Sequence, residues 1–194
     1  MFNNSDILQF IAKLKQIPGI SKKQAEKIVY WILDNPKEVV EDIATSFLDL
    51  KDKTTFCELC ANIKTDGKCV ICHNPKRTNQ LMIVENLQSL QKIESTDFYQ
   101  GKYYVFNTLV ENNGDLNKNK KQFDNLYDYA TAFDEIIIAI SPTLKGNLTS
   151  SVIKKQLVNM GLKVTELAIG VPLGASVDYI DPITLQFAIR NRRK

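Results

Sequence analysis

Four cysteines in two close pairs restrict the fold of this 194-residue chain more than any other feature. Two residues separate Cys57 from Cys60 and Cys69 from Cys72, and eight residues lie between the pairs. Each Cys-x2-Cys pair forms a tight turn that directs both sulfurs at one ion, and two such pairs complete a tetrahedral site. Residues 54–79 contain few large apolar side chains, so this stretch needs a staple in order to fold. We therefore predict one structural zinc ion, held in a zinc finger by all four thiolates.

Iron and disulfides are the alternatives to zinc at these cysteines. Four thiolates also suit iron, which would make the chain a coloured redox protein. Disulfides are less favoured, because the sequence has neither a signal-peptide pattern nor a run of 18 apolar residues, and we expect it in the cytoplasm, where thiols stay reduced. Four protein ligands leave no open position on the metal for catalysis. His73, the only histidine, is interpreted as a bystander, so no Ser/His or Cys/His catalytic system exists without it.

Net charge sets a limit on how the chain contacts nucleic acid. Apolar residues make up 44% and charged residues 24%, as in an ordinary soluble globular protein. The formal net charge is only +3. A nucleic-acid surface must therefore come from local clusters of Lys and Arg.

Residues 1–53 are predicted to form a helical region. Apolar periodicity predicts one helix that Ser5 caps, a second that Ser21 caps, and a third over about 37–50. A Pro-Gly turn at 18–19 separates the first two. Apolar side chains of the third helix are expected to face inward; they are Val39, Val40, Ile43 and Phe47.

The Pro-Gly turn between these helices has the pattern of a helix-hairpin-helix. Such a turn presents backbone N–H groups and a helix dipole that suit a DNA phosphate. Lys22, Lys23 and Lys27 add cations at the start of the second helix, so we predict that they bind the DNA backbone without reading sequence. The alternative is an ordinary pair of helices with solvated lysines.

Residues 80–170 alternate short apolar runs with helical stretches, which predicts an α/β fold with a parallel sheet. The strands are predicted at 81–84, 103–106, 136–140 and 164–168, and the helices at about 87–95, 121–132 and 147–160. The polar stretch 111–121 is expected to be a mobile loop. A last helix is predicted to begin at Asp181-Pro182.

Glu85 ends the first predicted strand, where open parallel sheets collect functional groups. A site for Mg²⁺-dependent phosphoryl transfer needs several carboxylates there. After the third strand the chain supplies Lys145 and Asn147 instead. We therefore predict a protein that is not an enzyme, with a Mg²⁺-dependent nuclease or topoisomerase-like enzyme as the alternative. Glu85 itself is alternatively a strand-end carboxylate that caps the next helix or pairs with a lysine.

The order of these features resembles the bacterial RecR recombination proteins. The resemblance covers a helix-hairpin-helix at 1–53, a four-cysteine zinc finger at 54–79, a Toprim-like α/β domain at 80–170 and a C-terminal oligomerisation segment at 171–194. Its most specific parts are the cysteine spacing and the stretch GVPLGASVDYID at 170–181.

The resemblance implies a DNA-binding recombination mediator in DNA repair without catalysis of its own. It implies a ring or clamp, as a homodimer or homotetramer joined through hairpins and C-terminal segments. This assembly is expected to act with RecO and RecF to load RecA. The DNA-facing positions of the family fall on Lys23 and Lys27. The family carries acidic residues for binding RecO where Lys145 and Asn147 stand. Either this chain does not bind RecO or its partner has changed with it, and Glu85 is the acidic position that remains.

Overall fold

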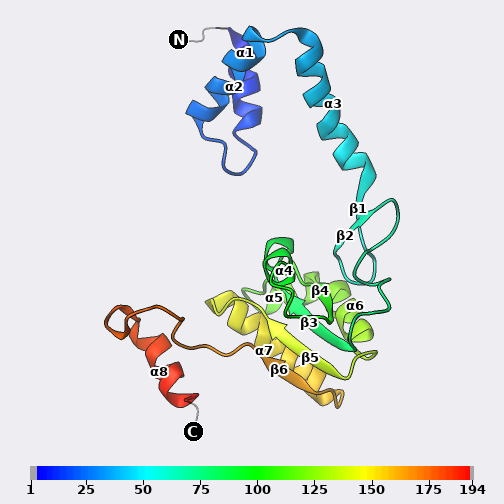
Figure 1. The fold of residues 1–194 in the computed structure, drawn as a ribbon, viewed down its shortest axis with the longest axis vertical. Coiled ribbons are helices and arrows are strands. Elements are labelled where there is room, and N and C mark those ends of the chain that lie inside the picture. The colour runs from blue at the N-terminus through cyan, green and yellow to red at the C-terminus, as the bar shows by residue number, and fades with distance from the viewer. Residues whose placement is uncertain (1–3, 193–194) are drawn as a thin grey trace. The chain divides into compact units, whose positions relative to one another are not determined.

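The chain divides into two compact units, Met1–Thr54 and Thr55–Lys194 (Figure 1). The computed structural model describes residues 4–192. Helices make up the first unit, whereas the second contains the cysteines, a parallel sheet and a final helix. The predicted mixed α/β class, with these parts in this order, is confirmed. The predicted division into four domains is finer than the two units and stays a prediction.

Three helices form the first unit: α1 (Ser5–Leu14), α2 (Lys22–Asp34) and α3 (Lys37–Lys53). Asn4, and not Ser5 as predicted, caps α1, because its side chain accepts hydrogen bonds from two backbone N–H groups of the first turn. Ser21 caps α2 as predicted, and Gln24 completes a capping box with it. Gly19 has a φ of 86°, a left-handed conformation that glycine adopts without strain.

The core of this first unit is small. Its buried apolar residues within the described range are Ile11, Ala25 and Val29. The expectation that the apolar side of α3 faces inward is wrong for this chain alone, since α3 buries no residue and Phe47 is 67% exposed. No further layer of this unit covers α3 within the described residues, so its apolar side chains border an open groove.

The second unit is built on a four-stranded parallel sheet. Its strands are β3 (Gln80–Val84), β4 (Lys102–Val105), β5 (Glu135–Ala139) and β6 (Val164–Glu166), in the order β4-β3-β5-β6. Val84 lies opposite both Val105 and Ala139, so the carboxyl ends of three strands meet at one edge. All four strands lie within one to two residues of their predicted positions.

Each face of the sheet has its own apolar cluster, because successive strand residues point to opposite sides. On one face Leu81 and Ile83 pack beneath α6 (Lys120–Ala130) and α7 (Leu144–Asn159). On the other face Met82 and Val84 pack with α4 (Leu87–Glu94) and the cysteine region. The sheet is therefore covered on both sides.

The polar stretch 111–121 differs from its prediction as a loop. It contains the helix α5 (Asn113–Lys118). The Asp115 carboxylate accepts hydrogen bonds from the backbone N–H groups of Glu111 and Asn112, which fixes the approach to this helix. Leu116 packs against the core and anchors the segment.

The C-terminal segment forms a short 3-10 helix, η1 (Val177–Tyr179), and the helix α8 (Pro182–Arg190). The Asp181 carboxylate caps α8 by accepting from the N–H groups of Ile183 and Thr184, so the predicted last helix is confirmed. Among the described residues no helix combines the length and apolar character needed to cross a membrane.

Candidate metal centre and nucleic-acid interface

The four cysteine sulfurs form one compact cluster. The first pair, Cys57 and Cys60, lies in the turn between β1 (Thr54–Phe56) and β2 (Ile63–Thr65). In this turn the Cys57 N–H donates a hydrogen bond of 2.7 Å to the Asn62 carbonyl. All four sulfurs lie within 4.8 Å of one another. In the part of the chain that the structure describes, this is the only group of three or more such side chains that could hold a metal.

The distances between sulfurs fit a tetrahedral metal site. Cys60 Sγ lies 3.7 Å from Cys69 Sγ, and Cys57 Sγ lies 4.0 Å from Cys72 Sγ. A tetrahedron with metal–sulfur bonds of about 2.3 Å has edges of about 3.8 Å. A disulfide would need a distance of about 2.05 Å between the two sulfurs. All four cysteines are free, so the cluster has the geometry of a four-thiolate site.

The electrostatics of the cluster also favour a cation. Burial raises the pKa of the Cys57 thiol, and a hydrogen bond to Cys72 together with burial raises the pKa of Cys60. In contrast, hydrogen bonds from Cys60 and from Tyr129 lower the pKa of Cys72 to about 5. Four thiolates this close to one another need a cation to offset their repulsion.

His73 stands beside the cluster without joining it. Its ring Nδ1 lies 3.1 Å from the carbonyl oxygen of Cys69. Since that contact is to the backbone, the four sulfurs form the ligand group without the imidazole ring.

The cysteine region is attached to the sheet. Cys57, Cys60 and Cys69 share an apolar cluster with the strands β3 and β4. The Val105 N–H on β4 donates to the Cys60 carbonyl over 2.9 Å. The Tyr129 hydroxyl lies 3.4 Å from Cys72 Sγ, a contact that sequence reasoning missed because 57 residues separate the two.

The three predicted DNA-binding lysines lie at the start of α2, and all are exposed. Lys22 is 3.9 Å from the Glu26 carboxylate. Within the described residues neither Lys23 nor Lys27 has an ion-pair partner, and their spacing of four places them on one side of the helix. The capping box already engages the N–H groups of Ser21 and Gln24, so fewer backbone donors are free for a phosphate than the sequence suggested.

Glu85 lies at the carboxyl edge of the sheet and is engaged by Ser141 from the neighbouring strand end. The Ser141 hydroxyl donates a hydrogen bond of 2.6 Å to this carboxylate, and the Ser141 backbone N–H donates one of 3.3 Å to the same group. Among the described residues, Glu85 therefore neither caps α4, which Asn86 does, nor pairs with a lysine. Sequence reasoning did not single out Ser141, because its role depends on the parallel pairing of β3 with β5.

Comparison with known proteins decides the family. A model described as "Toprim domain" matches residues 79–168, and one described as "RecR, C-terminal" matches residues 170–193. A protein named Recombination protein RecR from Mycoplasmopsis pulmonis is 41% identical, over 98% of this chain and 99% of the relative. A protein of the same name from Chloroherpeton thalassium is 34% identical, over 94% of this chain and 93% of the relative. Another, from Ehrlichia canis, is 33% identical, over 96% of this chain and 97% of the relative. This chain belongs to the RecR family.

The sheet edge of this RecR chain carries a lysine where the resemblance predicts acidic residues. Lys145 forms an ion pair with Glu111, and both side chains are more than half exposed. Gly146 between Lys145 and Asn147 is required by packing, because a Cβ there would lie 2.0 Å from the Ser141 carbonyl oxygen. The turn that holds Ser141 against Glu85 therefore keeps its glycine, while the charges beside it differ.

Proposed function

We propose that this chain is a DNA-binding recombination mediator that acts without catalysis of its own. The observation that carries the proposal is the similarity, over nearly the whole chain, to proteins named Recombination protein RecR. We further propose that it acts with RecO and RecF to load RecA. Lys145 and Asn147 make RecO binding the part of this proposal most in need of its own test.

The sheet edge supports a role without metal-dependent catalysis. Glu85 stands beside Ser141, and among the described residues it belongs to no group of three or more His, Cys, Asp or Glu side chains that could hold a metal. Mg²⁺ takes a near-octahedral set of oxygen ligands, and a single carboxylate supplies few of them. The cysteine site offers no alternative, because four protein thiolates leave no position for substrate.

We propose that zinc is the metal and that it is structural. Cys57, Cys60, Cys69 and Cys72 would hold it, since their spacing fits a tetrahedron and three of them are buried in the core cluster. Bound zinc would supply no reaction chemistry here. It would fix two turns that have too few apolar contacts of their own to stay folded.

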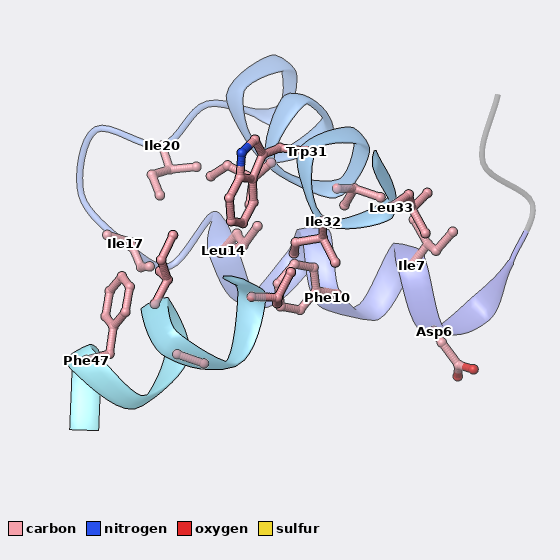
Figure 2. A pocket seen from close by; sticks show the side chains of 15 residues that line it. Asp6, Ile7, Phe10, Leu14, Ile17, Ile20, Trp31, Ile32, Leu33 and Phe47 are labelled. Carbon is pink, nitrogen blue, oxygen red and sulfur yellow. The ribbon is translucent and has the colours of Figure 1, made fainter. Parts of the chain in front are cut away.

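An apolar groove in the helical unit supports self-association. Figure 2 shows Phe10, Leu14, Trp31 and Ile32 converging between the helices, with Phe47 on α3 at one side. Such a surface on a small helical unit is typical of a protein interface. We propose that it pairs with a second copy of the chain, in a homodimer or a homotetramer.

DNA binding is proposed to be weak for each chain and strong for the assembly. The net charge of +3 gives little general attraction to phosphate. Lys23 and Lys27, with Lys22 beside them, provide a local cationic surface, and several copies around one DNA would combine their affinities.

The experiment that tests the proposal is DNA binding as a function of salt. The double variant Lys23→Ala, Lys27→Ala should weaken binding to all sequences alike. The slope of log K against log salt should fall by roughly 0.9 for each phosphate that is no longer bound on duplex DNA. The matched control is Lys37→Ala, Lys51→Ala, which removes the same charge from α3 and should bind as the parent does.

Equal binding by both double variants would remove the hairpin from the DNA surface. Arg190 and Arg192 on the C-terminal segment would then be tested next, whereas Arg193 and Lys194 lie outside the described residues. Mg²⁺-dependent nicking of plasmid DNA, abolished in Glu85→Ala, would favour the enzymatic alternative instead.

A further inference from the structure

Tyr129, on α6, brings a hydroxyl group to the edge of the cysteine cluster. Its oxygen lies 3.4 Å from Cys72 Sγ. The ring packs edge-on against Phe133, with centroids 5.0 Å apart, and tilted against Tyr104 at 6.1 Å. Aromatic neighbours on two sides restrict the ring, so the hydroxyl is held at the sulfur.

The direction of this hydrogen bond follows from the chemistry of a metal ligand. A cysteine that binds a metal has lost its proton, and its sulfur can only accept. The Tyr129 hydroxyl must then be the donor. Because its proton points at sulfur, it offsets part of the negative charge on that ligand.

Cys72 differs from the other ligands in exposure and in its donors. It is half-buried, whereas Cys57, Cys60 and Cys69 are buried. The Cys72 sulfur also contacts a hydroxyl group from outside the four cysteines, that of Tyr129. Solvent and competing chelators therefore reach Cys72 most easily, and the Tyr129 hydroxyl is the donor that α6 supplies there.

Tyr129 also joins two parts of the core. It packs against the cluster beneath α6 and α7, and against the cluster that contains Cys57, Cys60 and Cys69. Tyr129 thus connects the packing of α6 to the sulfur site.

We propose that Tyr129 is a positioning residue that donates a hydrogen bond to the metal-bound Cys72 thiolate, so that the packing of α6 helps to retain the metal. The inference rests on the proposed metal site. It extends that site from a local cysteine motif to a distant helix of the α/β unit.

The test uses the full chain and two single-atom deletions on the same helix. Tyr129→Phe removes the hydroxyl and keeps the ring, and we expect zinc retention against a chelator to fall about tenfold, the lower end of effects for such outer hydrogen bonds. Tyr127→Phe removes a hydroxyl two residues away that makes no hydrogen bond to a described residue, and it should retain zinc as the parent does.

A cobalt-substituted protein gives a readout that a purely structural role would not move. The sulfur-to-cobalt charge-transfer band depends on electron density at sulfur, so it should shift in Tyr129→Phe and not in Tyr127→Phe. If Tyr129→Phe is less stable, the spectrum of its folded, cobalt-loaded fraction still shows whether loss of the hydroxyl changes the electron density at sulfur.

Each outcome supports or overturns one statement. A parent protein without bound metal would overturn the proposed metal site itself. A loaded parent, with both variants equal to it in retention and spectrum, would overturn the role of Tyr129 alone. Equal loss of metal in both variants would assign the effect to general packing of α6 and would also overturn the hydrogen bond.

Discussion

The helical unit and the α/β unit of this RecR chain cover their apolar side chains in different ways. Both faces of the sheet are buried, one beneath α6 and α7 and the other beneath α4 and the cysteine region. The helical unit, in its described residues, buries only Ile11, Ala25 and Val29. Trp31 and Phe47 stay at an open groove.

This difference indicates how each unit reaches stability. A unit of about 50 residues buries a smaller share of its surface on folding than a larger domain does, so it is only marginally stable alone. The α/β unit is larger and is stabilised further by the cysteine region. We expect a metal to complete the second unit and another copy of the chain to complete the first.

The largest effect is expected from Cys69→Ser, which tests whether the α/β unit depends on a bound metal. Structural zinc contributes about 10–16 kcal/mol of apparent binding free energy in small domains, so losing one ligand should release the metal and unfold the cysteine region. Metal analysis and thermal unfolding check this. His73→Ala is the matched control and should keep its metal, since the ring contacts a backbone carbonyl. Tight metal binding by Cys69→Ser would contradict a site that needs all four ligands.

A smaller loss is expected from Leu126→Ala on α6, whose side chain is fully buried. Deleting a buried leucine side chain costs about 2–5 kcal/mol of unfolding free energy. Urea unfolding at two protein concentrations should show the same loss at both. Val158→Ala on α7, where the side chain is 52% exposed, should cost under about 0.5 kcal/mol. A loss that depended on concentration would mean that this core also needs a partner.

Phe47→Ala tests the helical side of the comparison. Phe47 is 67% exposed, so the dilute monomer should keep its unfolding free energy. Self-association should weaken by roughly 1–2 kcal/mol, the cost of truncating a good interface residue. Leu50→Ala is the control, because Leu50 is equally exposed on α3 but lies outside the groove. Sedimentation experiments measure the difference, and equal association of the two variants would place the interface elsewhere.

The smallest expected effect is a dependence of stability on pH, and it involves the α/β unit alone. Hydrogen bonds from Arg77 hold the pKa of the Glu94 carboxyl below its usual range. Such a carboxylate stabilises the fold at pH values above about 4.3, and this contribution disappears as the pH falls through the lowered pKa. Because Glu94 is about one-third exposed, Glu94→Gln should cost under about 1 kcal/mol at pH 7. The gap between parent and variant should close in acid, and a gap that stayed constant would show that charge is not its cause.

The sheet could be predicted from the sequence because its signal is local. Each strand is a short apolar run, and the helices between runs show their own periodicity. The clustering of the four cysteines was predictable for the same reason, since they come in two pairs with two residues between the members of each pair.

Contacts between distant segments could not be predicted in this way. Ser141 reaches Glu85 only because β3 pairs with β5, and Tyr129 reaches Cys72 only because α6 packs on the sheet. The periodicity of α3 identified its apolar side correctly, but it does not say what covers that side. The helix α5 was missed because a carboxylate–backbone contact at Asp115, and not apolar periodicity, defines its start.

The hydrogen bond from the Val105 N–H to the Cys60 carbonyl has a consequence for solubility. β4 lies at an edge of the sheet, and unpaired N–H groups on edge strands are templates for β-aggregation between molecules. The first cysteine turn occupies this position and blocks the approach of a foreign strand. A chain without its metal would therefore lose the folded cysteine turn. It would also expose the edge of β4, where a strand of another molecule could pair and start aggregation.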